Sequence, residues 1–176
     1  GPHPTADLVD SESLALGARL FINASRGGVL DDRALLSTPG VRAVLDVFQD
    51  EPAPPTELLD PAGPVVVATP HIAGYSRQAK DRATEMVIRP LAELFGWSLQ
   101  TQGANRRIEP LRAATVEEAI AMVCPLAPVE HELRRNPGAA QFRLARRRYP
   151  LREEFAAYRL EGVARPDLAA ALGFAV

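Results

Sequence analysis

Three short apolar segments, each running directly into polar residues, constrain the fold of this chain more than any other feature. They are residues 20–24 (LFINA), 41–48 (VRAVLDVF) and 64–68 (PVVVA). Few of their positions alternate between apolar and polar, which is typical of strands buried on both faces. Helix-like stretches separate them, and strands that alternate with helices favour a parallel sheet. We therefore predict an α/β fold in which helices cover both faces of a parallel sheet.

Helices are predicted around these strands from capping residues and apolar spacing. The stretches 11–16 and 33–37 each follow aspartates that can cap a helix, and Gly17 ends the first of them. Residues 76–95 form the longest predicted helix, in which we expect Pro90 to cause a kink or a break. Its apolar stripe consists of Ala79, Ala83, Met86, Val87, Leu91 and Leu94.

The C-terminal part of the chain differs from the rest in charge. Residues 1–100 hold 8 basic and 13 acidic side chains (net -5), whereas residues 101–176 hold 12 and 9 (net +3). We predict a first domain over 1–98, a polar linker over 99–111 and a compact α+β module over 112–176. The predicted elements of this module are helices over 116–123 and 166–172, a strand over 155–160 and a mixed stretch over 133–148 with a turn at 136–138.

Each of the three predicted strands leads to a charged side chain with no place in a core. Arg26 follows the first strand, Asp46 and Glu51 follow the second, and His71 follows the third. Ligands bind outside the carboxyl ends of the strands in open parallel sheets, so we expect these groups at one edge. A guanidinium can hold a carboxylate, and an imidazole oriented by a carboxylate can take a hydroxyl proton. The set suits oxidation of a 2-hydroxy acid, although a turn histidine and a solvated glutamate explain His71 and Glu51 if each is taken alone.

The same stretches resemble a known family. INASRGGVLDDRALL, VLDVFQDEP and TPHIAGYS are similar to three consecutive signatures of the NAD-dependent D-2-hydroxyacid dehydrogenases. The resemblance implies that Arg26 binds the substrate carboxylate, that Glu51 partners His71, and that His71 is the general acid/base. It further implies that Asp46 holds the nicotinamide carboxamide of NAD. We also assign Ala24, Ser25 and Gly74 to cofactor binding, Tyr75 more weakly to the substrate, and no residue to a metal.

The tail narrows the resemblance to one branch of this family. GPHPT, HIAGYS and RRRYPLREEFAAYRLEG resemble the erythronate-4-phosphate dehydrogenases, whose C-terminal module dimerises. This implies a small phosphorylated 2-hydroxy acid as substrate, a homodimer formed through residues 112–176, and a place in pyridoxal 5'-phosphate (vitamin B6) biosynthesis. A glyoxylate/hydroxypyruvate or 3-phosphoglycerate dehydrogenase stays open as an alternative, as does a non-catalytic remnant that only dimerises.

The chain contains no G-x-G-x-x-G sequence, the fingerprint of dinucleotide-binding domains. The resemblance therefore covers the second half of the Rossmann-type domain and the dimerisation module. We expect the fingerprint to lie upstream of Gly1 and the chain alone to be inactive or nearly so. We also expect an unpaired strand at the edge where further strands would join the sheet.

Charge and composition argue against other classes of partner. The formal net charge is -2, which favours neither nucleic acid nor a membrane surface. The arginines of RLARRRYP at 143–150 suggest nucleic-acid binding as an alternative, but Glu153 and Glu154 follow at once, which favours a solvated or interface helix. Cys124 is the only cysteine, so no internal disulfide forms, and we expect a reducing, cytoplasmic compartment.

Overall fold

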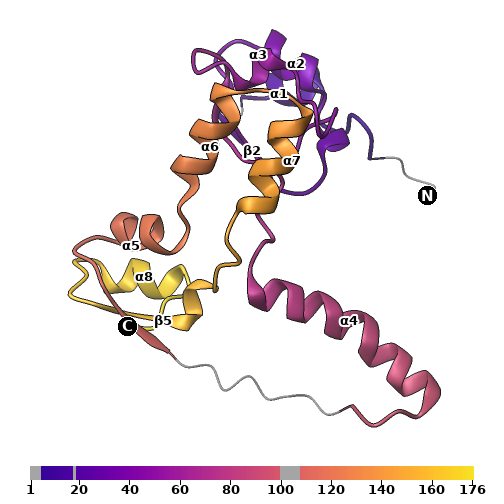
Figure 1. Ribbon diagram of the computed structural model, residues 1–176. Coiled ribbons are helices and arrows are strands. Elements are labelled where there is room, and N and C mark those ends of the chain that lie inside the picture. Colours follow the sequence, from indigo (N-terminus) through magenta and orange to yellow (C-terminus); the bar gives the residue numbers. More distant parts are fainter. Residues whose placement is uncertain (1–4, 18, 100–107) are drawn as a thin grey trace. The chain divides into compact units, whose positions relative to one another are not determined.

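The computed structural model describes residues 5–17, 19–99 and 108–176, which form two compact units (Figure 1). Gly1–Ala73 and Leu126–Tyr149 belong to the first unit, and Gly74–Pro125 and Pro150–Val176 belong to the second. This division differs from the predicted domain boundaries at 98 and 111, because each unit is assembled from two separate stretches of the chain.

The first unit is built on a parallel sheet, as predicted. Its strands are β1 (Leu20–Asn23), β2 (Arg42–Leu45) and β3 (Val65–Ala68), hydrogen-bonded in this order. Ile22 lies opposite Val44 in the register of β1 and β2. The α/β class is therefore confirmed. The short helices between the strands are α1 (Ser11–Ala15), the 3-10 turn η1 (Gly27–Val29), α2 (Asp32–Ser37) and α3 (Thr56–Leu59).

The second strand is shorter than its apolar run predicted. The run extended to residue 48, but β2 ends at Leu45. Val47 and Phe48 are nevertheless buried, with 1% and 2% of their surface exposed. Their apolar character reflects burial in the turn that follows the strand, which a periodicity argument reads in the same way as a strand.

Two helices from the C-terminal half complete the core of the first unit. They are α6 (Leu126–Arg135) and α7 (Ala139–Arg148), separated by the predicted turn at 136–138. Leu133 and Phe142 lie in the same hydrophobic cluster as the three strands, and the ring of Phe142 meets that of Phe48 edge-on at 6.2 Å. Burial of these side chains, worth about 1.5–3 kcal/mol each, explains why residues 126–149 belong to this unit.

Polar groups on α6 also satisfy the outer edge of β3. The Glu130 carboxylate accepts a hydrogen bond from the Ala68 amide at 3.2 Å, and the Arg134 guanidinium donates to the Val65 carbonyl at 2.9 Å. Arg134 and Glu130 form an ion pair at 2.9 Å. The free backbone groups of an edge strand are a template for unwanted pairing, so this pair protects β3.

The opposite edge of the sheet is open within the described residues. There β1 has β2 as its one strand partner, and Leu20 and Ile22 expose 53% and 62% of their surface. The unpaired strand was predicted. The prediction that helices cover both faces of the sheet is wrong for this part, because the helices of the described chain leave these side chains of β1 exposed.

The second unit contains a long helix and a small parallel sheet. Helix α4 (Arg77–Phe95) comes first, and β4 (Glu109–Arg112) pairs with β5 (Tyr158–Glu161). Because β4 starts at Glu109, the predicted linker ends earlier than residue 111; its residues 100–107 lie outside the described part. The other elements are α5 (Val116–Val123), η2 (Phe155–Ala157) and α8 (Pro166–Ala171).

A second hydrophobic cluster holds this small sheet and its helices together. The rings of Phe155 and Phe174 stack at 4.6 Å. The predicted helices over 116–123 and 166–172 and the predicted strand over 155–160 are found within three residues of their expected bounds. The mixed stretch 133–148 was placed in this module incorrectly, because its helices belong to the first unit. The buried members of the cluster are Ala113, Val116, Ala119, Val123, Leu160, Ala169 and Phe174.

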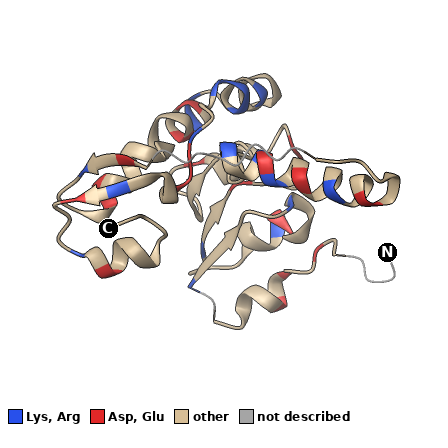
Figure 2. Ribbon diagram, turned by 90° about the horizontal axis from the view of Figure 1, so that it is seen from below, with Lys and Arg blue, Asp and Glu red and all other residues tan. Residues whose placement is uncertain are grey.

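Helix α4 differs from its prediction in two respects. It continues through Pro90 to Phe95, so the proline does not break it. Its apolar stripe is also exposed, with Met86 at 74% and Leu94 at 75%. Basic and acidic side chains alternate along the same helix, as Figure 2 shows. An amphipathic pattern identifies a helix but not what covers its apolar side.

The start of α4 is held by Glu153 and Glu154, which lie within the tail sequence RRRYPLREEFAAYRLEG. Ser76 caps the helix, and its hydroxyl also donates to the Glu154 carboxylate at 3.1 Å. Arg77 pairs with Glu153 at 2.7 Å, and Arg82 donates to both oxygens of Glu154. Glu153 and Glu154 thus join two distant stretches of the second unit.

No helix among the described residues is long and apolar enough to cross a membrane.

Candidate active site

Asp46 organises the turn that carries His71. It follows β2, is 5% exposed, and accepts hydrogen bonds at Oδ1 from the Thr69 hydroxyl (2.7 Å) and the Ile72 amide (2.7 Å). Its Oδ2 accepts from the Ala73 amide at 2.9 Å. A carboxylate with three such donors is well compensated for its burial. Asp46 therefore ties the end of β2 to the end of β3.

His71 has an unusual backbone held in place by this network. Its φ is +57°, in the left-handed region that a residue with a side chain rarely adopts. The His71 amide donates to the Asp46 carbonyl at 2.7 Å. Backbone strain of this kind persists where the surroundings determine the conformation, and it is common at functional sites.

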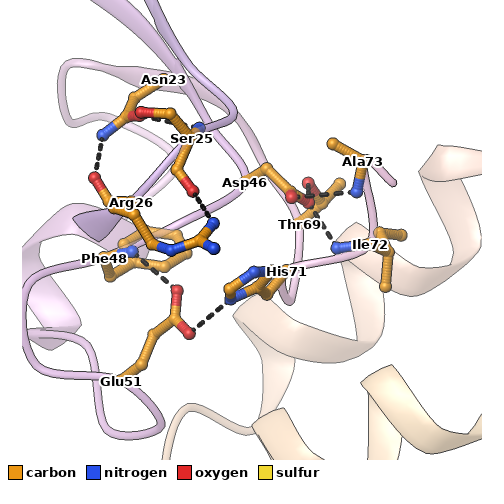
Figure 3. Close-up of polar contacts among 10 residues, drawn as sticks. All are labelled: Asn23, Ser25, Arg26, Asp46, Phe48, Glu51, Thr69, His71, Ile72 and Ala73. Atoms are coloured by element: carbon orange, nitrogen blue, oxygen red, sulfur yellow. Dashed lines mark hydrogen bonds and ion pairs between the residues drawn. The ribbon is translucent and has the colours of Figure 1, made fainter. Parts of the chain in front are cut away.

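The side chains of His71 and Glu51 form a hydrogen-bonded pair (Figure 3). Nδ1 of His71 lies 2.8 Å from Oε2 of Glu51, so in the neutral ring Nδ1 carries the hydrogen and donates it. The other oxygen of Glu51 accepts from the Phe48 amide at 3.0 Å. Because Nδ1 is engaged with Glu51, Nε2 is the ring atom left to act on a ligand. The imidazole is partly exposed, with 30% of the side-chain surface accessible. The pair has the geometry of a general base and its orienting acid.

Arg26 comes from the end of β1 and approaches the same edge of the sheet. The buried Asn23 shapes its turn: Nδ2 donates to the Arg26 carbonyl at 3.0 Å, and Oδ1 accepts from the Ser25 amide at 3.1 Å. The Arg26 guanidinium donates to the Ser25 carbonyl at 2.7 Å. Figure 3 shows it extending toward the Glu51–His71 pair. The exposed guanidinium has further donors that can hold a carboxylate.

The glycines that follow Arg26 differ from each other. A Cβ on Gly27 would lie 1.8 Å from the Phe48 carbonyl oxygen, whereas a Cβ on Gly28 would meet nothing within 4 Å. Only Gly27 is therefore required for the close approach of two backbone segments. This contact brings the loop after β1 against the turn that carries Glu51.

The remaining predicted site residues are placed as follows. Ala24 and Ser25 are exposed at the end of β1. Gly74 and Tyr75 lie in the second unit, where the Lys80 ammonium sits 3.8 Å from the centroid of the Tyr75 ring. Their roles stay predictions, as does the cofactor contact of Asp46. No group of three or more metal-ligating side chains occurs among the described residues.

Sequence reasoning missed three residues that shape the site, namely Asn23, Asp32 and Thr69. Asp32 is 3% exposed, and its Oδ2 accepts from the Gln49 amide at 3.0 Å. Burial, followed by the charges of Asp50, Asp31 and Asp7, raises the pKa of the Asp32 carboxyl to about 6. For Asn23, the preference of asparagine for turns was an available signal. For Asp32, the sequence offered only a helix cap.

Comparison with known proteins gives these groups a context. Residues 3–73 match the family described as D-isomer specific 2-hydroxyacid dehydrogenase, NAD binding domain. This segment is similar to the NAD binding domain of these dehydrogenases. The matched segment contains β1, β2, β3 and all three side chains of the Arg26, Glu51 and His71 set. The resemblance stated from sequence motifs is therefore confirmed.

Curated relatives extend the similarity to the C-terminal part. The chain is 34% identical to the erythronate-4-phosphate dehydrogenase of Teredinibacter turnerae, with all of this chain and 52% of that protein covered. It is 37% identical to that of Bacteroides fragilis, over 91% of this chain and 47% of that protein. The chain spans about half the length of the curated relatives it matches.

A solved structure is similar as well. It is the D-isomer specific 2-hydroxyacid dehydrogenase of Xanthobacter autotrophicus Py2, in complex with NADPH and MES. Sequence identity is 33%, the match covers 58% of this chain and 44% of that one, and the TM-score is 0.42.

Proposed function

We propose that this chain supplies the acid/base half of an NAD-dependent erythronate-4-phosphate dehydrogenase. The observation that carries the proposal is the hydrogen bond of 2.8 Å between His71 and Glu51, at the sheet edge that also bears Arg26. The identity to erythronate-4-phosphate dehydrogenases over the whole chain supports this choice of substrate. The proposed reaction converts 4-phospho-D-erythronate to 2-oxo-3-hydroxy-4-phosphobutanoate, in pyridoxal 5'-phosphate biosynthesis. A single cysteine is compatible with the cytoplasm as the compartment.

Each side chain has a distinct task in this reaction. Arg26 holds the substrate carboxylate by two parallel hydrogen bonds and so places the hydroxyl of C2 near His71. Nε2 of His71 takes the hydroxyl proton as the carbonyl forms, and Glu51 stabilises the imidazolium through Nδ1. A bound NAD would supply the acceptor for the hydride that leaves C2.

The residues fit part of an NAD site. The exposed residues Ala24 and Ser25 and the turn hydrogen-bonded to Asp46 offer a surface at the carboxyl ends of the strands, where nucleotides bind to such sheets. We assign this surface to the nicotinamide end, and the cofactor contact of Gly74 stays a prediction from the family resemblance. No glycine-rich phosphate loop of the G-x-G-x-x-G type occurs in the sequence. The chain alone is therefore expected to bind NAD weakly and to turn over no substrate.

The test is complementation with the missing fingerprint. The chain is mixed with a polypeptide that carries the G-x-G-x-x-G half of the Teredinibacter turnerae relative, and NADH formation from 4-phospho-D-erythronate is followed. We expect no turnover by the chain alone, turnover by the mixture, and at least about a hundredfold loss with His71→Ala. Turnover by the chain alone, or by a His71→Ala mixture at the wild-type rate, would refute the assignment.

The same complementation assay distinguishes two alternative functions. Faster turnover of glyoxylate, hydroxypyruvate or 3-phosphoglycerate would identify another dehydrogenase of this family. A non-catalytic remnant would give no turnover in a mixture that demonstrably forms a complex. Sedimentation of the chain tests the proposed homodimer of residues 112–176, which both the enzyme and the remnant would share.

A further inference from the structure

The Glu51–His71 pair depends on the position of one turn. Glu51 lies at the end of the segment Phe48–Glu51, and its Oε1 accepts from the Phe48 amide within that segment. This internal bond gives the segment its shape, but it cannot fix the segment relative to β3, which leads to His71. Contacts with other parts of the first unit must do so.

Contacts with other parts of the first unit hold the Phe48–Glu51 turn from outside. The ring of Phe48 packs edge-on against Phe142, and Gly27 lies directly against the Phe48 carbonyl. The third contact is polar: Oδ2 of Asp32 accepts from the Gln49 amide at 3.0 Å, across 17 positions in sequence. The Gln49 side chain also donates from Nε2 to Oδ1 of Asp7 at 3.4 Å, between exposed groups. The Asp32 carboxylate differs in that it accepts from a backbone amide of the turn, two residues from Glu51.

Asp32 occupies this place under unfavourable conditions. It is 3% exposed, and its Oδ1 is buried with no hydrogen-bond partner. The charges around it are Asp31 at the start of the same helix, Asp50 in the turn, and Asp7 in the segment before α1, all of which oppose its ionisation. Its neighbour Asp31 already caps α2 by accepting from the Arg33 and Ala34 amides. Capping therefore gives no reason for a second aspartate at position 32.

We propose that Asp32 is a positioning residue, which fixes the Phe48–Glu51 turn through the Gln49 amide and so sets the hydrogen bond between Glu51 and His71. The inference rests on the proposed function only for the acid/base role of His71. The mechanical link from Asp32 to the imidazole is a property of the first unit and can be measured without activity.

The test compares three variants of the whole chain by NMR. Asp32→Ala removes the acceptor, Asp32→Asn retains an acceptor oxygen, and Asp31→Ala weakens the start of α2 without touching the turn. The measured quantities are the exchange rate of the Gln49 amide and the ring nitrogen shifts of His71, which report which nitrogen carries the hydrogen. We expect Asp32→Ala to raise the exchange rate at least about tenfold and to lose the Nδ1–H signature.

Asp32→Asn and Asp31→Ala should keep that signature. A folded Asp32→Ala protein with a freely exchanging Gln49 amide and an unchanged His71 ring would overturn the proposal. Loss of the signature in Asp31→Ala to the same extent would also overturn it, because a general loosening of α2 would then explain the effect.

If the Asp32→Ala variant does not fold, hydrogen exchange measured in the wild-type chain tests the proposal instead. The proposal requires the Gln49 amide and the hydrogen on Nδ1 of His71 to become exchangeable together under mild denaturant, since the bond from Gln49 to Asp32 sets the bond from His71 to Glu51. Opening of the Gln49 amide while the Nδ1–H signature of His71 stays unchanged would refute it. Neither readout involves turnover, so failure of this inference is distinguishable from failure of the proposed dehydrogenase activity.

Discussion

Replacement of Gly27 by alanine gives the sharpest test of how the site is assembled. A Cβ at this position would lie 1.8 Å from the oxygen and 2.2 Å from the carbon of the Phe48 carbonyl. Ordinary contacts of this kind are about 3.4–4 Å, so the two backbone segments must separate by roughly 1.6 Å. The obstacle is backbone rather than the end of a flexible side chain, so it cannot rotate away.

The expected loss of stability follows from this displacement. Overpacking costs about 1–3 kcal/mol, and a clash with backbone belongs at the upper end. Alanine also restricts the unfolded chain, which stabilises by about 0.4–1 kcal/mol wherever the backbone accepts it. Gly28→Ala receives that gain without a clash, because nothing lies within 4 Å of its Cβ. We therefore expect Gly27→Ala to be about 3 kcal/mol less stable than Gly28→Ala.

The assay is urea denaturation followed through the amide signals of the β1–β3 sheet, because the two units need not unfold together. The same spectra report the His71 ring, whose Nδ1–H signature should weaken in Gly27→Ala alone. Free energies of unfolding within about 0.5 kcal/mol of each other would refute the reasoning. The Gly27 contact would then not be needed to hold the turn.

Three further predictions concern buried charged groups. Because burial raises the pKa of Asp32 to about 6, its proton is held more tightly in the folded state. The wild-type free energy of unfolding should therefore fall relative to Asp32→Asn by about 2 kcal/mol as pH rises from about 4 to 7; equal pH dependence in urea denaturation would contradict this. Arg134→Ala should destabilise the first unit by about 3 kcal/mol, by exposing the edge of β3 and leaving Glu130 unpaired, whereas the exposed Arg135→Ala should change its melting temperature little. Asp46→Asn should cost about 2–3 kcal/mol, since its amide must face at least one N–H donor; protected Ile72 and Ala73 amides in that variant would exclude the mechanism.

The order of elements and the edge that carries the charged side chains were predictable from sequence. Each strand was marked by a short apolar run, and each run ended at a polar residue, so the rule for parallel sheets placed Arg26, Glu51 and His71 together. The contact between Glu51 and His71 agrees with that expectation. Chemistry at strand ends is predictable because it depends on topology more than on packing.

Long-range packing was not predictable in the same way. The Glu130–Arg134 pair reads as an ordinary i, i+4 pair on a helix surface, yet it satisfies the edge of β3 more than 60 residues away in sequence. The stripe of α4 reads as a core face, yet Leu94 is 75% exposed. Helical periodicity states which side chains share a face and says nothing of what meets that face.

The adjacent aspartates at the start of α2 show where such reasoning ends. Either aspartate satisfies the rule for a helix cap, and the sequence alone did not decide which of the two caps α2. In the structure Asp31 accepts from the first amides of α2, while Asp32 turns inward to the Gln49 amide. The two environments differ because only position 32 faces the turn after β2, and the location of that turn follows from the packing of Phe48 and the contact at Gly27. A local pattern can therefore predict the contact between Glu51 and His71, whereas the position of Asp32 beside the Gln49 amide depends on contacts that form only when the unit is folded.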